Sequence, residues 1–435
     1  MEVGQGSDGM KRKLSRIEGF LNGNLVCFVS VDGHFTYDQL RVALARVQRK
    51  HPALRRVIRA DADGLYYEDA SSVEIPLRVA EGDYSQECER ELTTDFDHNK
   101  PQLRVVWLRQ APPGLLFATS HRICDGMSIL LIVKEVLTAL CSDENLIPYD
   151  AITVADIIGD YRPPKPWKFK LLVSLFNFVL RFIPSSGAPS SKREQFLEWR
   201  ASQDLTEAIR RRSKIEGISV HAVLLTALNC ALCTVFGNRA PKWINSQIDP
   251  RRGRFRALRK DMLFFGGGSF KTATAPVRPE QFWARARAIQ EDMPRLIEEE
   301  IAKIPARFYL FESLRPLSDG QLRWIMRLIE AWTGRRRMGG FALSNWGNVD
   351  LLPYDAPLRI NDVRLYVHSF KTKALGLLPY SVNGEMRFYC VSHEDCMTPD
   401  NMAALEREFM TILEAQSTEL PHAATAAAMH VSAGS

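Results

Sequence analysis

The stretch SHRICDGMS, residues 120–128, sets a histidine, an aspartate and a glycine between two apolar segments. Residues 115–119 are typical of a buried strand, and residues 127–140 are typical of a helix. An imidazole at the end of a buried strand can remove a proton from a hydroxyl or an amine, because its ordinary pKa is near ~6.5. We therefore predict that His121 is a general base.

Asp125 and Gly126 complete this motif. Asp125 cannot easily bind His121 if the loop turns away, and a carboxylate close to a core needs a cation, for which arginine offers a bidentate pair. Gly126 lets the turn close and lets a substrate pass near the backbone. The alternative is a core histidine beside an aspartate that caps a helix, and the short motif alone favours that alternative.

Two other kinds of site find less support in the sequence. Ser120 cannot be the nucleophile for His121, because adjacent residues of an extended chain point to opposite faces, and no G-x-S-x-G segment occurs. A metal site would need more ligands, but no second histidine stands four residues after His121 and no HExxH occurs. We therefore expect neither a serine hydrolase nor a bound metal.

The elements around the motif alternate between strands and helices, which predicts an α/β (α+β) fold with sheets covered by helices. An apolar face follows Asp38, which we expect to cap a helix. The expected strands are 25–31, 57–58, 65–68, 103–108, 115–119, 341–344, 363–369, 376–381 and 386–392, and the expected later helices are 193–214, 220–236, 279–302, 319–333 and 398–415.

The chain of 435 residues is longer than one typical domain, and its 46% hydrophobic content allows a large core. Residues 184–192, PSSGAPSSK, are typical of a linker. We therefore predict an N-terminal half, residues 1–185, and a C-terminal half, residues 193–416. Residues 417–435 are predicted to be a disordered tail.

The net charge of +6 suits an anionic small molecule or an acidic protein, but it is too small and too dispersed to indicate nucleic-acid binding. The N-terminus has no apolar core typical of a secretory signal, and no run of 18 apolar residues predicts a transmembrane helix. The eight scattered cysteines indicate free thiols in a reducing compartment. We therefore expect a cytoplasmic protein.

Several segments, taken in order, resemble the CoA-dependent acyltransferase superfamily, which includes chloramphenicol acetyltransferase and the condensation domains of peptide synthetases. HRICDG is similar to its H-x-x-x-D-G motif, and VQRKHPALRRVI (47–58) to its RHPxLR segment. GISVHAVLLTALNCAL (217–232), NSQIDPRRGR (245–254), FALSNWGNVD (341–350) and the closing segment 380–409 resemble further segments of the superfamily. The resemblance covers residues 15–415.

This resemblance implies two chloramphenicol-acetyltransferase-like subdomains with mixed sheets and a tunnel between them. It implies that an acyl group passes from a CoA or carrier-protein (phosphopantetheine) thioester to a small alcohol or amine acceptor. His121 would be the base for direct attack, with no permanently bound cofactor, in natural-product or lipid biosynthesis. Ester formation is favoured over amide formation, and we expect a monomer.

The same resemblance implies roles for four further residues. Asp125 would be structural, with Arg251 or Arg252 as its cation. Ser344 and Asn345 would approach from the second half and donate to the oxyanion or to the substrate. The alternative for Ser344 and Asn345 is an ordinary turn after a strand.

The chain also departs from its relatives. Ser120 stands where many condensation domains have the first histidine of HHxxxDG, and SNWG stands where plant BAHD acyltransferases have DFGWG. Stand-alone alcohol or polyketide-associated acyltransferases are therefore the best neighbours. Two alternatives stay open: a stand-alone condensation domain that forms an amide, and a non-catalytic domain that recruits a partner.

Two surface features of the sequence could bind partners. Arg335, Arg336 and Arg337, like the cluster at 251–259, could bind the phosphates of CoA or an acidic carrier protein, or could form a solvated face. Residues 165–184 join three lysines to about fourteen apolar residues, which is too short to span a bilayer. They could form a core helix, a cover over an apolar channel, or a peripheral membrane contact.

Overall fold

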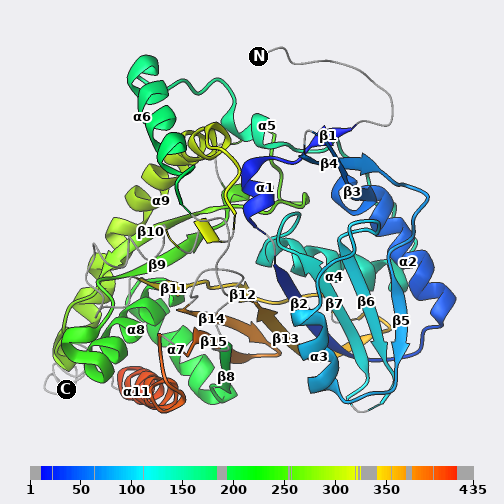
Figure 1. Ribbon diagram of the computed structural model, residues 1–435. Coiled ribbons are helices and arrows are strands. Elements are labelled where there is room, and N and C mark those ends of the chain that lie inside the picture. The colour runs from blue at the N-terminus through cyan, green and yellow to red at the C-terminus, as the bar shows by residue number, and fades with distance from the viewer. Residues whose placement is uncertain are drawn as a thin grey trace, which may run out of the picture.

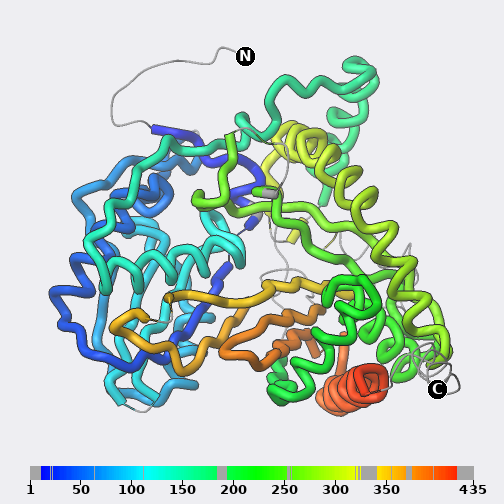
Figure 2. The backbone as a smooth tube through the Cα atoms, turned by 180° about the vertical axis from the view of Figure 1, so that it is seen from behind, coloured from blue at the N-terminus to red at the C-terminus, as the bar shows by residue number. Residues whose placement is uncertain are grey.

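The computed structural model describes residues 11–418, except for residues 22, 63, 111, 184–193, 253–254, 256, 319, 322–323, 325–339, 354, 369–374 and 395. The described elements form two lobes side by side, each with a mixed sheet and helices packed on it (Figures 1 and 2). This arrangement confirms the predicted α/β fold class.

The first lobe contains a five-stranded sheet in the order β13-β2-β7-β6-β5. All neighbours are antiparallel except β5 and β6. Strand β7 is buried along its whole length because it is central in this sheet, and its last residue precedes His121. The strands are β2 (Asn24–Asp32), β5 (Leu77–Ala80), β6 (Leu103–Leu108), β7 (Gly114–Ser120) and β13 (Arg359–Val367), and the helices are α2 (Tyr37–Lys50), α3 (Tyr84–Thr93) and α4 (Gly126–Cys141).

Strand β13 comes from the predicted second half, yet it completes the sheet of the first lobe. It pairs with β2 in antiparallel register, with Val363 opposite Val29. A small separate sheet, β1-β4-β3, lies at the edge of the same lobe. Its strands are β1 (Arg12–Lys13), β3 (Arg56–Asp61) and β4 (Gly64–Asp69). Two short helices, α1 (Arg16–Phe20) and η1 (Pro52–Arg55), are next to these strands in the chain.

The second lobe contains a sheet in the order β10-β9-β11-β14-β15-β8, with β12 paired to β14. The strands are β8 (Glu194–Arg200), β9 (Trp243–Ile248), β10 (Gly268–Ala273), β11 (Phe341–Leu343), β12 (Gly347–Asn348), β14 (Leu375–Val382) and β15 (Glu385–His393). The helices are α7 (Gln203–Ile215), α8 (Val220–Phe236), α9 (Phe282–Ser313) and α11 (Pro399–Thr418), with short turns at η2 (Gly237–Arg239), η3 (Pro250–Arg252) and η4 (Pro279–Gln281).

Helix α8 is the central helix of the second lobe and packs against α9 and α11. The segment Val220–Arg239 is the one stretch of the described chain that is long and apolar enough to cross a membrane. Because 67% of its apolar window is buried, it serves here as a core helix.

Two expectations about elements need correction. Residues 194–200 form β8 in place of the start of a helix, because the segment pairs with β15 and helix α7 begins only after the Ser202 cap. Helix α2 is capped by Thr36 and not by Asp38, since the Thr36 side chain accepts from the Gln39 amide. The predicted helix 319–333 and the tail 417–435 fall mostly outside the described residues.

A third apolar cluster ties the two lobes together. It joins Ile17 of α1 and Ile157 of α5 (Val154–Ile158) to Phe264, Phe265 and Phe308 from the second half of the chain. The loop after η3 therefore packs against the first lobe. This contact decides how residues of the second half reach the motif after β7.

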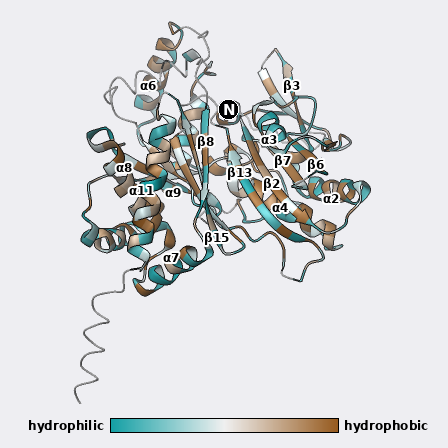
Figure 3. Cartoon of the chain, turned by 90° about the horizontal axis from the view of Figure 1, so that it is seen from below, coloured by the Kyte–Doolittle hydropathy of each residue, from teal (hydrophilic) through white to brown (hydrophobic). Residues whose placement is uncertain are grey.

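Helix α6 (Pro166–Val179) lies at the edge of the molecule, away from both sheets (Figures 1 and 3). One narrow face docks on α9: Phe169 lies 5.4 Å from Tyr309 between ring centroids, and Asn177 bonds the backbone at Ser313 and Arg315. The opposite face is exposed and apolar. Its exposed residues are Trp167, Leu171, Leu172, Leu175, Phe176, Phe178 and Val179, and Phe182 follows the helix.

Candidate active site

His121 lies in the turn directly after β7, and its backbone is fixed by the neighbouring strands. The His121 N–H donates to the Gly23 carbonyl at 2.6 Å, just before β2 begins. The Ser120 N–H donates to the Gln102 carbonyl at 3.1 Å, just before β6 begins. Hydrogen bonds on both sides therefore hold the end of β7, which fixes the backbone from which the imidazole of His121 extends.

The imidazole of His121 is kept in its neutral form. Burial lowers its pKa below the ordinary value, and the backbone near His121 and Cys124 offsets only part of this effect. The Nδ1 atom is fully buried, with no partner of normal hydrogen-bond geometry in the described part of the chain. The residue as a whole is partly exposed. A neutral imidazole can accept a proton.

Asp125 does not turn toward His121 but caps helix α4. Its Oδ1 accepts from the Ser128 amide at 2.8 Å, which satisfies one of the unpaired N–H groups at the start of the helix. The Asp125 N–H donates to the Phe264 carbonyl at 2.8 Å. Hydrogen bonds thus hold both the side chain and the backbone of Asp125.

Arg251, on η3 of the second lobe, is the cation that pairs with Asp125. Its two terminal nitrogens donate to the two Asp125 oxygens at 2.9 and 3.0 Å, in a bidentate pair. Asp249 is a second counter-ion at 2.9 Å, and the Met262 carbonyl accepts from Nε at 3.0 Å. These carboxylates raise the pKa of Arg251 although its burial opposes this. The side chain of Arg252 lies outside the described residues.

A second buried network braces the same region, and no role was predicted for its residues. His51 is fully buried between Glu135 of α4, at 2.6 Å from Nε2, and Tyr149, at 2.8 Å from Nδ1. The Tyr149 hydroxyl accepts from the Leu263 amide at 2.8 Å, so its own proton goes to Nδ1 and the Nε2–H goes to Glu135. Lys50 adds an ion pair to Glu135.

Through Tyr149 this network binds the Leu263 amide of the loop 261–264, whose Phe264 amide donates to the Ser128 hydroxyl of α4. Burial lowers the pKa of His51, so it stays neutral. The available signal was Glu135, an acidic residue inside an apolar helix pattern, because a buried carboxylate demands partners. The segment KHPALR contains the buried histidine, but a sequence pattern could not identify the partners of that histidine.

The turn after β11 brings the second lobe against Gly126. A Cβ on Gly126 would lie 2.4 Å from Cζ2 and 2.6 Å from Cε2 of the Trp346 indole. The space in which we expected a substrate to pass beside Gly126 is therefore filled by Trp346. Gly126 is needed for this close approach and not for an unusual backbone angle, since its φ is not positive.

Ser344 and Asn345 support this turn. The Ser344 Oγ accepts from the Trp346 indole N–H at 2.7 Å, and the Asn345 side-chain oxygen accepts from the Gly347 amide at 2.9 Å. The Ser344 N–H donates to Leu377 of β14 at 3.0 Å. Among the described residues, no acceptor is seen for the hydroxyl proton of Ser344 or for the amide protons of Asn345. Arg335, Arg336 and Arg337 lie outside the described residues.

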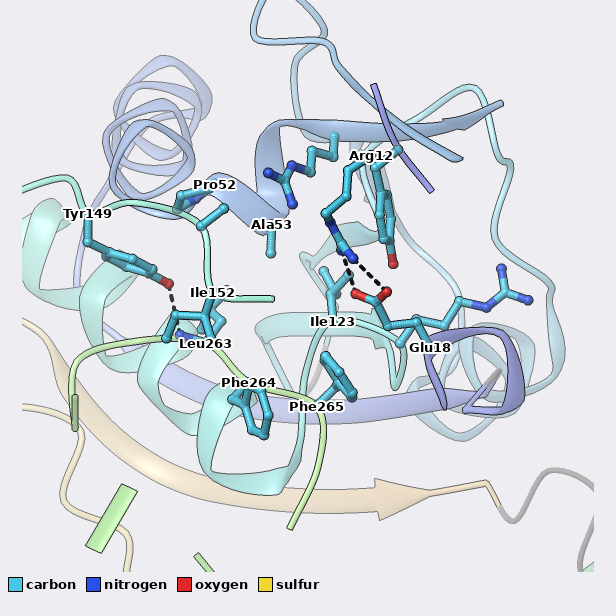
Figure 4. A pocket seen from close by; sticks show the side chains of 14 residues that line it. Arg12, Glu18, Pro52, Ala53, Ile123, Tyr149, Ile152, Leu263, Phe264 and Phe265 are labelled. Atoms are coloured by element: carbon cyan, nitrogen blue, oxygen red, sulfur yellow. Dashed lines mark hydrogen bonds and ion pairs between the residues drawn. The ribbon is translucent and has the colours of Figure 1, made fainter. Parts of the chain in front are cut away.

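A small pocket of about 30 Å³ lies beside the motif, between α1, η1 and the loop 263–265 (Figure 4). Arg122 and Ile123, which follow His121, form part of its wall. The remaining walls combine arginines with apolar side chains. The apolar lining includes Pro52, Ala53, Ile152, Leu263, Phe264 and Phe265.

Comparison with known sequences gives short matches only. No protein-family model matches the chain. The chain is 26% identical over 238 residues to the chondramide synthase cmdD of Chondromyces crocatus, which covers 48% of this chain and 6% of that protein. It is 32% identical over 120 residues to CymA, a probable non-canonical nonribosomal peptide synthetase of Salinispora arenicola, which covers 26% of this chain and 2% of that protein. The chain thus spans a small part of the length of these relatives.

Comparison with solved structures is much broader. The epimerization domain of the third module of tyrocidine synthetase B matches 96% of this chain and 98% of its own, with a TM-score of 0.65 and 14% identity. The TRI3 trichothecene 15-O-acetyltransferase of Fusarium sporotrichioides matches 96% and 97%, with a TM-score of 0.65 and 12% identity. The first condensation domain of the calcium-dependent antibiotic synthetase matches 95% and 98%, with a TM-score of 0.63 and 12% identity.

The chain therefore has the two-lobed fold of condensation domains and of acyltransferases similar to chloramphenicol acetyltransferase. This confirms the resemblance read from the sequence. At these sequence identities the comparison establishes the fold alone, and the reaction has to be inferred from the residues of the site.

Proposed function

We propose that this protein is an acyltransferase that moves an acyl group from a CoA or carrier-protein thioester to a hydroxyl acceptor. One observation carries the proposal: a neutral, partly exposed His121 stands at a rigid strand end, next to an aspartate that is locked to an arginine of the other lobe. Residues of both lobes thus hold the base in position, and its imidazole remains neutral.

In the proposed reaction, Nε2 of His121 takes the proton of the acceptor hydroxyl. The oxygen attacks the thioester carbonyl, the C–S bond breaks, and the sulfur leaves with the proton that His121 returns. Direct attack needs no acyl-enzyme. The nearest thiol, Cys124, is fully buried, and burial raises its pKa well above the ordinary value, so it is a poor nucleophile.

Ser344 and Asn345 are the proposed donors to the oxyanion of this reaction. They lie in the turn whose Trp346 touches Gly126, and their donor protons are not used within that turn. The role of Asp125 is structural: with Arg251 it holds the start of α4 and the turn that carries His121. Donors that meet a developing oxyanion stabilise it strongly in a site that excludes water.

The second candidate is an amide-forming condensation reaction, which needs the same base and differs only in the acceptor. The match to a probable nonribosomal peptide synthetase favours this candidate. The same fold also occurs in an epimerization domain, so turnover must be tested and not assumed. Ser120 in place of a second histidine is the feature that sets this chain apart from common condensation domains.

The test is turnover with acyl-CoA and acyl-carrier thioesters, each offered alcohol and amine acceptors. We expect ester formation that falls about 10²–10⁴-fold in His121→Ala, the usual contribution of a general base. Because the pKa of His121 is lowered, activity should stay constant through neutral pH and fall only below about pH 6.5. Wild-type rates in His121→Ala would refute the mechanism, and amide products alone would select the second candidate.

We also propose that α6 contacts a membrane surface. Residues 161–184 contain five basic residues and no acidic one, and the exposed apolar face of α6 lies among them. This combination matches a helix that lies in the interface of an anionic bilayer. Such a location would suit an acceptor or product with a long apolar chain.

A further inference from the structure

The pocket beside the motif contains more positive charge than the protein itself neutralises. Arg12 donates both terminal nitrogens to Glu18, so this pair is balanced. Arg56 and Arg122 also line the pocket, but neither forms an ion pair with a carboxylate of the described residues. The Arg122 side chain contacts the ring of His98 at 3.3 Å, which carries no negative charge. Two half-buried guanidinium groups therefore have no counter-ion at ion-pair distance among the described residues.

Tyr67 gives independent evidence that the pocket awaits a polar ligand. Its ring is 1% exposed and lies under the guanidinium groups of Arg12, at 4.8 Å, and Arg56, at 5.9 Å. Tyr67 lines the pocket, and its hydroxyl is fully buried and has no hydrogen-bond partner in the described part of the chain. A buried hydroxyl without a partner is costly, so a ligand that accepts its proton would remove that cost.

We propose that this pocket binds a small oxyanion, a carboxylate or a phosphate group at the end of a slender or apolar chain. Arg56 and Arg122 would supply the charge-assisted hydrogen bonds and Tyr67 a neutral one. This inference goes beyond the proposed acyl transfer and does not depend on it.

The size and walls of the pocket fit this class of ligand. A volume of about 30 Å³ is roughly twice what one water molecule requires, which leaves room for two or three oxygen atoms. Phe264 and Phe265, which stack with centroids 4.8 Å apart, form an apolar wall beside the polar end. The backbone of Phe264 also bonds Asp125, so an occupied pocket would contact the loop that braces the motif.

The test measures ligand-induced thermal stabilisation of the full chain, with inorganic phosphate and hexanoate as probes and sodium chloride at matched ionic strength as the reference. A ligand that binds only the folded state raises the melting temperature in proportion to its affinity. Arg56→Gln should weaken the binding about tenfold, as expected for the loss of a charge-assisted contact. Arg59→Gln is the matched control, because Arg59 lies on the same strand and pairs with Glu68 at 2.8 Å.

Tyr67→Phe separates binding from folding. It should weaken binding of the probe several-fold without lowering the melting temperature of the free protein, because it removes a hydroxyl that has no partner. Stabilisation by phosphate alone would identify a phosphorylated ligand, and stabilisation by hexanoate alone a carboxylate. The proposal fails if neither probe stabilises the protein more than chloride at about 50 mM. It also fails if Tyr67→Phe and Arg56→Gln respond to the probes like Arg59→Gln.

Discussion

Asp125 shows how one side chain can serve a site without contacting the reacting atoms. It caps α4, pairs with Arg251 from the other lobe and keeps the turn after β7 in place. Only 3% of the Arg251 side chain is exposed, so its charge depends on the carboxylates around it. Glu135 is a further buried carboxylate that depends on its partners, His51 and Lys50.

Asp125→Ala should therefore reduce stability as well as turnover. Removing one partner of a buried ion pair costs about 3–5 kcal/mol, and we expect the lower end here because Asp249 still neutralises Arg251. Thermal or denaturant unfolding would measure the loss. His121→Ala is the control that should lose turnover with little change in stability. An unchanged midpoint for Asp125→Ala would mean that the pair contributes nothing to folding.

Two elements from different lobes meet at the start of α4. The turn between β11 and β12 places the indole of Trp346 where a Cβ of residue 126 would be. The contact joins the motif helix to the sheet of the second lobe, so each lobe helps to position the other.

Gly126→Ala should disrupt this contact. Its new methyl would overlap the indole, and overpacking of this kind costs about 1–3 kcal/mol and displaces the neighbouring side chain. Turnover should fall because the turn with Ser344 moves too. Gly19→Ala, where no heavy atom lies within 4 Å, should be neutral or slightly stabilising. Trp346→Leu in the Gly126→Ala background should restore part of the stability, and the absence of any rescue would place the damage elsewhere.

The exposed apolar face of α6 leads to a prediction about lipid binding. The protein should sediment with vesicles of phosphatidylcholine and phosphatidylglycerol but less with phosphatidylcholine alone, because each basic residue near an anionic surface adds about 1 kcal/mol. Replacing Leu171, Leu175 and Phe178 by serine should abolish binding, since these side chains are 63%, 58% and 55% exposed. Ile215→Ser, at an equally exposed apolar position on α7, is the control. Equal binding by all variants would mean that the exposed apolar face of α6 does not contact the membrane.

The two lobes are joined by features that are far apart in the chain. β13 completes the first sheet, Arg251 reaches Asp125, and the cluster around Phe264 binds α1 and α5 to α9. Two histidines lie near this junction: His51 contacts Tyr149, which binds the loop 261–264, and His121 belongs to the motif that the loop braces. His221 lies deeper in the second lobe, 3.2 Å from the Ser246 hydroxyl.

The folded protein should lose stability in mild acid. Burial lowers the pKa of His51, His121 and His221, the last to about 4, whereas an unfolded histidine titrates near ~6.5. The unfolded chain thus binds more protons, so the stabilisation is complete above pH ~6.5 and is lost as pH falls through the folded pKa values. His221 alone should remove about 1.4 kcal/mol per pH unit between about pH 6.5 and 4.

Melting temperatures from pH 7.5 to 5 would measure this slope, before most carboxylates titrate. His221→Gln should show a shallower decline than the wild type, because one proton-binding difference is gone. Parallel declines in the two proteins would mean that the pKa of His221 does not differ between the folded and unfolded states.

The sequence alone determined the local elements and the identity of the motif. The apolar run 115–119 predicted β7, the helix 220–236 has the bounds that its pattern predicted, and HRICDG pointed to His121 and Asp125. These features depend on neighbours in the chain, whose periodic burial a sequence displays directly.

Only the tertiary structure decided which distant residues complete the site. It selected Arg251 as a partner of Asp125, filled the space at Gly126 with Trp346, and joined His51 to Glu135 and Tyr149. Residues 194–200 became a strand because β15 offers a partner for their backbone. Each of these contacts joins residues far apart in the chain, and charge or apolar pattern cannot name such a partner until the fold has closed the distance.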